Sequence, residues 1–244
     1  MKKRLDVLIF EKGLVKSRSE GLAFILTQKV KVNDKIIDKA GQQVDIDANI
    51  VIEIDESKRF VSRGGLKLDK AIKEFKIDLS NKICLDIGAS TGGFTDCMLQ
   101  NAAKKVYALD VGYGQLDWKL RNNEKVVNLE KINFRIWNGM ELDDRIDFVS
   151  IDVSFISLKK ILQNLNNLLR YKFVCVALIK PQFEVGRLKI GKNGVVRDQS
   201  ARHEVVCDIK NFINDINLEV IGICESPIKG YAGNIEYLIC FKKI

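Results

Sequence analysis

The feature that most constrains the fold is a regular alternation of short apolar runs with amphipathic stretches over residues 66–244. Seven runs are typical of strands: ICLDIG, VYALDVG, VVNLE, FVSIDVSF, FVCVALIK, LEVIGICES and IEYLICF. Helical spacing between most of them predicts a mostly parallel sheet with helices on both faces. The last two runs are joined only by ESPIKGYAGN, so we expect an antiparallel hairpin at the sheet edge.

The first 56 residues have a different pattern and predict a small α+β module. Two short helical patterns come first, and Ser17 with Glu20 forms a capping box before the second. The segment KVKVNDKII then predicts a hairpin with Asn33-Asp34 as its turn. A basic linker, residues 57–65, joins this module to the larger domain, residues 66–244, and its Gly64-Gly65 pair makes it flexible or tightly bent.

Positive charge is concentrated in the small module. The whole chain has a formal net charge of +8, and residues 1–39 carry ten Lys or Arg against five Asp or Glu. Such a surface suits the phosphates of structured RNA, although a solvated charged face is the ordinary alternative. The stretch RLDVLIFEKGLVKSRSEGLAFILTQKVKVNDKIIDKAGQQV resembles the S4 RNA-binding domain. The residues expected to contact RNA from this module are Lys3, Arg4, Arg18 and Lys39.

A glycine-rich turn, LDIGASTGGFTD, follows the first strand of the larger domain. Such a turn brings backbone amides close to a ligand, but this one lacks both the dinucleotide and the P-loop spacing. Asp110 ends the second strand, where a carboxylate can accept hydrogen bonds from ribose hydroxyls, and Asp86 can orient the loop and meet a cationic ligand. A tight structural turn and an NAD site are the alternatives.

The combination resembles S-adenosylmethionine binding by class I (Rossmann-like) methyltransferases, whose seven-stranded sheet has an antiparallel last strand. The expected cofactor-binding residues are Asp86, Gly88, Ala89, Ser90, Thr91, Gly92, Gly93, Phe94, Asp110 and Asp152.

Four charged residues occupy functional positions in this scheme. Lys67 opens the helix before the first strand, Asp152 and Lys180 end the fourth and fifth strands, and Glu236 lies in the final hairpin. Each one alone would be a surface charge or a structural ion pair. Lys180 differs, because it ends a continuous apolar run directly before Pro181. Desolvation and a nearby cation favour a neutral lysine, which can take the proton from a ribose hydroxyl.

The four residues are similar to the Lys-Asp-Lys-Glu tetrad of FtsJ-like ribose 2′-O-methyltransferases. Together with FVSRGGLKL, DVGYGQL, IDVSFISL, LIKPQFEVGR and SPIKGYAGNIEYL they resemble the TlyA family, which joins an S4 domain to an FtsJ-like domain. The resemblance implies methylation of the ribose 2′-hydroxyl of cytidines in ribosomal RNA, with these four residues as the catalytic set. Some members carry a haemolysin label. The chain ends are similar to the shorter subgroup, which implies 23S RNA, and hence the 50S subunit, as the target, with 16S RNA as an additional alternative.

Beyond Lys180, residues 186–202 are basic and contain glycine, as expected for a mobile loop that closes over RNA or for a simple connection. The residues expected to contact RNA from the larger domain are Arg63, Arg135, Arg187, Lys189 and Lys192.

Several classes of protein are disfavoured. His203 is the only histidine, so no metal site is expected. No apolar stretch approaches the roughly 20 residues that span a bilayer, and acidic residues interrupt the N-terminal apolar patch, so a cytoplasmic protein is expected. A non-catalytic RNA-binding ribosome assembly factor, a membrane-lytic protein and a small-molecule methyltransferase remain as alternatives, and the oligomeric state is left open.

Overall fold

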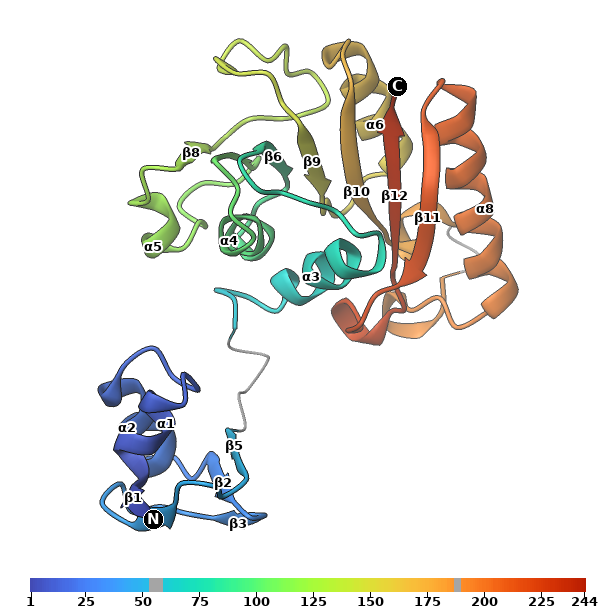
Figure 1. The fold of residues 1–244 in the computed structure, drawn as a ribbon. Helices are drawn as coiled ribbons and strands as arrows, with labels where there is room; N and C mark the ends of the chain where they lie inside the picture. Colours follow the sequence, from blue (N-terminus) through green and yellow to red (C-terminus); the bar gives the residue numbers. More distant parts are fainter. Residues whose placement is uncertain (53–58, 187–189) are drawn as a thin grey trace. The chain divides into compact units, whose positions relative to one another are not determined.

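The computed structural model describes residues 1–52, 59–186 and 190–244. The chain divides into two compact units, residues 1–59 and 60–244 (Figure 1). Within the described ranges, no helix is both long and apolar enough to cross a membrane. The same residues hold no group of three or more His, Cys, Asp or Glu side chains arranged to bind a metal ion.

The small unit packs two helices beside short strands. Its elements are β1 (Lys2–Arg4), α1 (Leu5–Glu11), α2 (Arg18–Leu26), β2 (Val30–Val32), β3 (Lys35–Ile36), β4 (Gln43–Asp45) and β5 (Ile50–Ile52). Leu5, Ile9, Ile25 and Val30 are fully buried and form its core. Strands β2, β3 and β5 form one antiparallel sheet, and β1 pairs with β4 in another.

Local sequence signals account for two features of this unit. Ser17 caps α2 by accepting a hydrogen bond from the Glu20 amide, as predicted, but the Glu20 carboxylate accepts from the Lys16 amide and not from that of Ser17. Asn33 and Asp34 have φ values of 47° and 66°, and this left-handed pair makes the predicted hairpin turn.

The large unit contains all seven predicted strands in one mixed sheet. In chain order they are β6 (Ile83–Ile87), β7 (Lys105–Leu109), β8 (Val126–Leu129), β9 (Phe148–Ile151), β10 (Phe173–Ile179), β11 (Glu219–Glu225) and β12 (Tyr237–Lys243). Their spatial order is β11-β12-β10-β9-β6-β7-β8. Only β12 runs opposite to the other six strands of this sheet, so the class I methyltransferase topology and the edge hairpin are confirmed.

Helices cover both faces of this sheet (Figure 1). The helices α6 (Leu158–Leu168) and α8 (Gln199–Asp215) pack on one face, and α3 (Gly64–Glu74) and α4 (Gly93–Gln100) on the other. Alternate residues of β6 supply the two cores: Leu85 faces α6, and Cys84 faces α3 and α4. The shorter helices are α5 (Trp118–Arg121), α7 (Pro181–Glu184), η3 (Lys192–Gly194) and η4 (Tyr231–Gly233).

The end of the predicted linker belongs to the large unit. Phe60 is 5% exposed, and its ring lies where a Cβ on Gly65 would overlap it. Gly64 and Gly65 form the first turn of α3. Close packing against Phe60, and not chain flexibility, is therefore the physical reason for glycine at position 65. Residues 53–58, which include the start of the predicted linker, lie outside the described residues.

Candidate active site

Four charged side chains from distant parts of the chain meet at the carboxyl edge of the sheet. Lys67 Nζ lies 2.7 Å from Glu236 Oε2 and 3.9 Å from Asp152 Oδ2. Lys180 Nζ lies 2.5 Å from Asp152 Oδ1. The side chains therefore form one continuous chain of ion pairs, Glu236–Lys67–Asp152–Lys180, hereafter the tetrad. The structure brings together the four residues that the sequence predicted to act together.

The tetrad is largely withdrawn from solvent. The side chain of Glu236 is 2% exposed, and that of Lys67 is 10% exposed. The Lys180 side chain is 11% exposed and that of Asp152 is 21% exposed. Two cations and two anions balance, which is the condition under which charges can be buried at tolerable cost.

One carboxylate oxygen of the tetrad, Asp152 Oδ1, has an ion-pair partner but no hydrogen bond from the described residues. Lys180 Nζ approaches Asp152 Oδ1 outside hydrogen-bond geometry, and its hydrogen bond goes to Ser154 Oγ at 2.9 Å. Asp152 Oδ1 is buried and accepts no hydrogen bond from the described residues. Its polar contact is the ion pair with Lys180.

The loop before β12 holds Glu236 in place. A Cβ at Gly230 would overlap the Glu236 carboxylate, so only glycine allows this approach. The Ser226 amide donates to the Glu236 carbonyl at 2.9 Å. The buried Asn234 side chain then donates to Gly194 O and accepts from the Val196 amide, both at 3.0 Å. Asn234 thus ties part of the basic loop, residues 191–196, to the hairpin that carries Glu236.

The glycine-rich loop lies beside the tetrad. Gly88 has a φ of +84°, and a Cβ there would overlap the carbonyl oxygen of Asp152. Asp110 accepts hydrogen bonds from the Ser90 amide at 2.8 Å and from the Gly112 amide at 2.7 Å, one on each carboxylate oxygen. These bonds orient the Asp110 carboxylate and leave each oxygen a lone pair for a ligand hydroxyl.

Two cavities flank this loop. One, of about 340 Å³, is lined by Lys67, Asp152 and Lys180 together with Gly88, Ala89, Ser90, Thr91, Gly93 and Phe94. The other, of about 460 Å³, is lined by Asp110 and by apolar side chains such as Val111, Ile132 and Phe134. Both include Gly88, Ser90, Asp152 and Ser154, so one extended ligand can pass from the apolar cavity to the tetrad.

Two predicted ligand-binding residues have another role. Asp86 is fully buried beneath the loop, where it accepts hydrogen bonds from Thr95 Oγ1 at 2.7 Å and from Ser150 Oγ at 2.8 Å. It lines neither cavity, so its position does not support the expected contact with a cationic ligand. Burial raises the pKa of the Asp86 carboxyl to about 6. Gly92 packs under Leu120 and also lines neither cavity.

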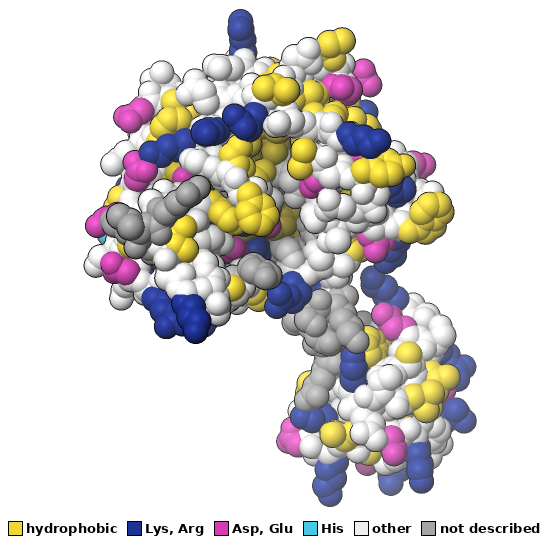
Figure 2. Space-filling view, turned by 180° about the vertical axis from the view of Figure 1, so that it is seen from behind, with side chains coloured by type: hydrophobic (Ala, Val, Ile, Leu, Met, Phe, Trp, Pro, Cys, Tyr) yellow, Lys and Arg dark blue, Asp and Glu magenta, His cyan; other side chains and the backbone are white. Residues whose placement is uncertain are grey.

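The predicted RNA contacts fall into two groups. In the large unit, Arg63 lines the tetrad cavity and Arg135 the apolar one, and both are exposed. In the small unit, Lys3 pairs with Glu11, Arg4 and Arg18 share Asp6, and Lys39 is exposed. Figure 2 shows basic side chains on the surface of both units. Arg187 and Lys189 lie outside the described residues. Lys192 is exposed in η3.

Comparison with known proteins identifies the family. Residues 60–243 match the FtsJ-like methyltransferase family, and residues 3–50 match the S4 domain. Hemolysin A of Brachyspira hyodysenteriae is 46% identical over 98% of this chain and 99% of its own length. The 16S/23S rRNA (cytidine-2′-O)-methyltransferase TlyA of Mycobacterium tuberculosis is 37% identical over 97% of this chain and 88% of its own. The 23S rRNA (cytidine-2′-O)-methyltransferase TlyA of Campylobacter jejuni is 33% identical over 98% and 99%.

The chain belongs to the TlyA family. A solved structure from Streptococcus thermophilus, provisionally described as a hemolysin, is similar with a TM-score of 0.75, 44% identity and coverage of 99% of this chain and 88% of that one. Both predicted domain types of the TlyA family are therefore present, and the chain is a methyltransferase.

S-adenosylmethionine is the methyl donor of this family, and the residues present fit it. The oriented Asp110 carboxylate suits the ribose hydroxyls of its nucleoside. The apolar cavity suits its base, and Gly88 has no side chain to stand between that cavity and the tetrad. Asp152 stands at the junction of the two cavities.

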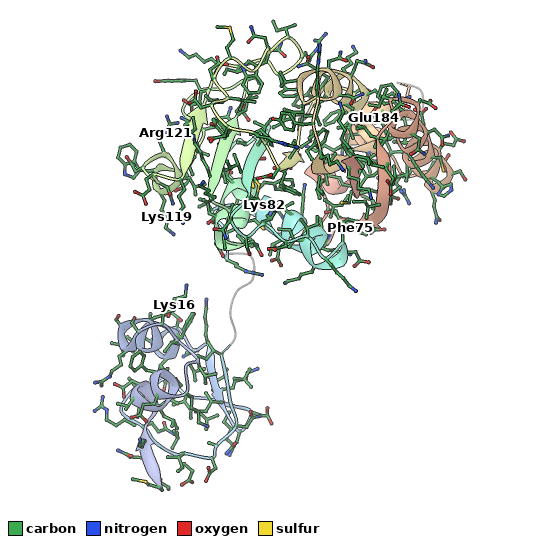
Figure 3. All side chains as sticks on the ribbon, turned by 45° about the horizontal axis from the view of Figure 1, so that its top comes forward. Lys16, Phe75, Lys82, Lys119, Arg121 and Glu184 are labelled. Carbon is green, nitrogen blue, oxygen red and sulfur yellow. The ribbon has the colours of Figure 1, made fainter. Side chains whose placement is uncertain are left out.

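The sequence did not reveal one carboxylate that connects the chain segments carrying Lys180 and Asp152. Glu184, labelled in Figure 3, ends α7 four residues after Lys180. Its Oε1 accepts from the Leu158 amide at 2.6 Å and its Oε2 from Ser157 Oγ at 2.7 Å. Glu184 therefore caps α6, which begins just after the Asp152 loop, and links the Lys180 segment to it. The spacing of one helical turn from Lys180 was the available signal.

We expect Asp86→Asn to change how stability depends on pH. Burial raises the pKa of the Asp86 carboxyl to about 6 in the folded state. Below about pH 4 this carboxyl is protonated in both the folded and the unfolded state. Above pH 6 it is ionised in both states, and the folded state bears the full cost of a buried charge. The wild type should therefore lose roughly 3 kcal/mol relative to the variant as pH rises through this window. Chemical denaturation from pH 4 to 7.5 measures it, with exposed Asp215→Asn as control. Parallel curves for wild type and variant would contradict it.

We expect Glu184→Ala to lower the free energy of unfolding by about 1–2 kcal/mol, the usual effect of losing a helix cap. Glu184→Gln should retain most of the stability, because its amide can accept from Leu158 N and donate to Ser157 Oγ. Urea denaturation of the three proteins provides the comparison. Equal losses in both variants would mean that the charge, and not the capping geometry, is what matters.

Proposed function

We propose that this protein methylates the ribose 2′-hydroxyl of a cytidine in ribosomal RNA, with Lys180 as the general base. The observation that carries the proposal is the buried tetrad beside a loop suited to S-adenosylmethionine. The names of the Mycobacterium and Campylobacter relatives supply the substrate class. The S4 domain provides a second reason to expect RNA.

The proposed chemistry assigns one task to each tetrad residue. S-adenosylmethionine supplies a methyl group already activated by its sulfonium. Lys180 takes the proton of the 2′-hydroxyl, and the ribose oxygen forms its bond to the methyl carbon while the carbon–sulfur bond breaks in line. Asp152 holds the Lys180 amine at the cavity. Lys67 and Glu236, 2.7 Å apart, position the ribose and balance charge.

RNA binding is proposed to involve both units. The S4 unit would contact phosphates through Lys3, Arg4, Arg18 and Lys39, and the large unit through Arg63, Arg135, Arg187 and Lys189, with Lys192 as a further contact. The target cytidine must leave its stack to bring its ribose to the tetrad, as for other enzymes that modify nucleotides within folded nucleic acid. Within the ribosome, 23S RNA of the 50S subunit is the proposed target.

The non-catalytic assembly-factor alternative has no role for the tetrad. Buried charges cost stability and are retained where they act, so an ion-pair chain that opens into a cavity favours catalysis. A small-molecule substrate would leave the S4 domain without a purpose.

Lys180→Ala should bind S-adenosylmethionine with unchanged affinity and lose methyl transfer by about 100- to 10,000-fold, the range for loss of a general base. Lys229→Ala is the matched control, because Lys229 lines the same cavity and lies outside the tetrad. Calorimetry measures cofactor binding, and incorporation of labelled methyl into ribosomal RNA measures turnover. Normal turnover in Lys180→Ala would refute the assignment of the base.

Labelled methyl should enter 50S and not 30S subunits when both are isolated from cells that lack the modification. The wild type and Lys180→Ala are compared on each subunit, and the labelled nucleoside is identified after digestion. Label in both subunits would retain the chemistry and contradict the restriction to 23S RNA. Label in neither, with the cofactor bound, would contradict the substrate.

A further inference from the structure

A third cavity, larger than the two beside the glycine-rich loop, lies away from the tetrad, at the opposite edge of the central strands. It has a volume of about 570 Å³. Residues at the starts of β6, β9 and β10 and at the end of β12 line it, together with the segment that follows α3. Phe75 and Lys82, both labelled in Figure 3, belong to this amino-edge cavity. No step of the proposed methyl transfer uses it.

Positive charge dominates the lining of the amino-edge cavity. Six cationic side chains line it against two carboxylates. The cations are Lys76, Lys82, Arg145, Lys172, Lys242 and Lys243, and the carboxylates are Asp78 and Asp147. Both carboxylates already accept hydrogen bonds from backbone amides, those of Ser80 and Ile83. The lining of the cavity therefore carries net positive charge and favours an anionic ligand.

The six cations differ in whether their charged groups have hydrogen-bond or ion-pair partners among the described residues. Lys242 pairs with Glu219, Arg145 stacks on Tyr171, and Lys243 donates to neutral oxygens of Asn166 and Leu169. Lys76, Lys82 and Lys172 are exposed, and their side chains make no hydrogen bond or ion pair with the described residues. Lys76 and Lys172 thus stand at the cavity with uncommitted ammonium groups, and Lys82 interacts electrostatically with Asp78.

An apolar wall faces these lysines. A β-bulge interrupts the pairing of β11 with β12 between Val220 and Gly222, and the residue between them, Ile221, is 46% exposed and lines the cavity. The half-buried Phe75 ring packs against Gly222 and also lines it. Bulges redirect side chains, and here the result is an isoleucine and a phenylalanine held beside a cationic rim.

The lining side chains are of only two chemical kinds. All are apolar or charged, and no hydroxyl or amide side chain is among them. Apolar and aromatic side chains can support a base, and cationic side chains can hold phosphates. The chemistry therefore matches single-stranded nucleic acid, with a base on the apolar wall and phosphates on the lysines.

We propose that the amino-edge cavity is a second RNA-binding site, which takes an unpaired nucleotide of the substrate RNA. The inference rests on the proposed function, because that function supplies an RNA large enough to reach both edges of the sheet. Lys82 and Lys172 bind the phosphates of the strand, and Phe75 with Ile221 supports the base. The site increases affinity for RNA without taking part in the methyl transfer.

The test uses the full-length chain saturated with S-adenosylmethionine and an unstructured RNA of about eight nucleotides. Fluorescence anisotropy should give a Kd at least tenfold higher for Lys82→Glu/Lys172→Glu than for wild type. The slope of log Kd against log salt should fall by about one to two, as expected for lost phosphate contacts. The matched control is Lys160→Glu/Lys210→Glu, which makes the same charge change at exposed positions of α6 and α8.

Apolar support of the base is tested separately with Ile221→Ser. This variant should weaken binding of the normal strand and leave binding of an abasic strand of equal length unchanged. With ribosomal RNA as substrate, the Lys82/Lys172 variant should show a raised KM and an unchanged kcat.

Equal Kd values for the two double variants, with methyl transfer intact in the wild type, would overturn the second site and leave the proposed function standing. A wild type that binds the strand through Lys82 and Lys172 but transfers no methyl to ribosomal RNA would support the site and contradict the function. A free nucleotide that binds more tightly than the strand would replace RNA as the ligand.

Discussion

The ion pair between Lys67 and Glu236 is the contact on which the catalytic edge depends. Glu236 is almost fully buried, and a carboxylate in that position without its lysine would be an uncompensated charge. The pair joins α3, which precedes the first strand, to the loop before the last strand, 169 residues apart. The fold must therefore bring both ends of the methyltransferase domain together before the tetrad can exist.

Backbone contacts make this convergence possible. Gly88 allows the glycine-rich loop to touch the carbonyl of Asp152, and Gly230 allows its loop to touch the carboxylate of Glu236. Asp152 itself bridges Lys67 and Lys180, so its position is determined from three sides. The apolar cavity and the tetrad cavity then share one wall, formed by Gly88, Ser90, Asp152 and Ser154.

The sequence predicted the elements whose signals are local. The strands follow from apolar runs, the small hairpin from Asn33-Asp34 and the α2 cap from Ser17. It did not predict β1 or β4, because Lys2–Arg4 and Gln43–Asp45 are short and polar and become strands only by pairing with each other. The tetrad residues were found because strand ends converge and a family resemblance selected them.

Burial was what sequence reasoning could not supply. Asp86 and Asp110 stand at the ends of neighbouring strands and look alike in the sequence, yet Asp86 is fully buried under two hydroxyl donors and Asp110 faces a cavity. Gly65 looked like part of a flexible or bent linker because its partner, Phe60, is an isolated aromatic residue with no periodic pattern. Glu184 was not singled out, since its partners at 157 and 158 belong to another element.

The contacts of Asn234 have a consequence for how RNA binding and chemistry are related. Its side chain holds Gly194 and Val196, and its own segment leads within two residues to Glu236. Any movement of residues 191–196 on binding RNA must either break these two hydrogen bonds or be transmitted to the hairpin. In the first case binding bears the cost of a buried amide losing its partners, and in the second the Lys67–Glu236 pair shifts. Where residues 191–196 contact RNA as proposed, binding is therefore coupled either to these two hydrogen bonds or to the Lys67–Glu236 pair.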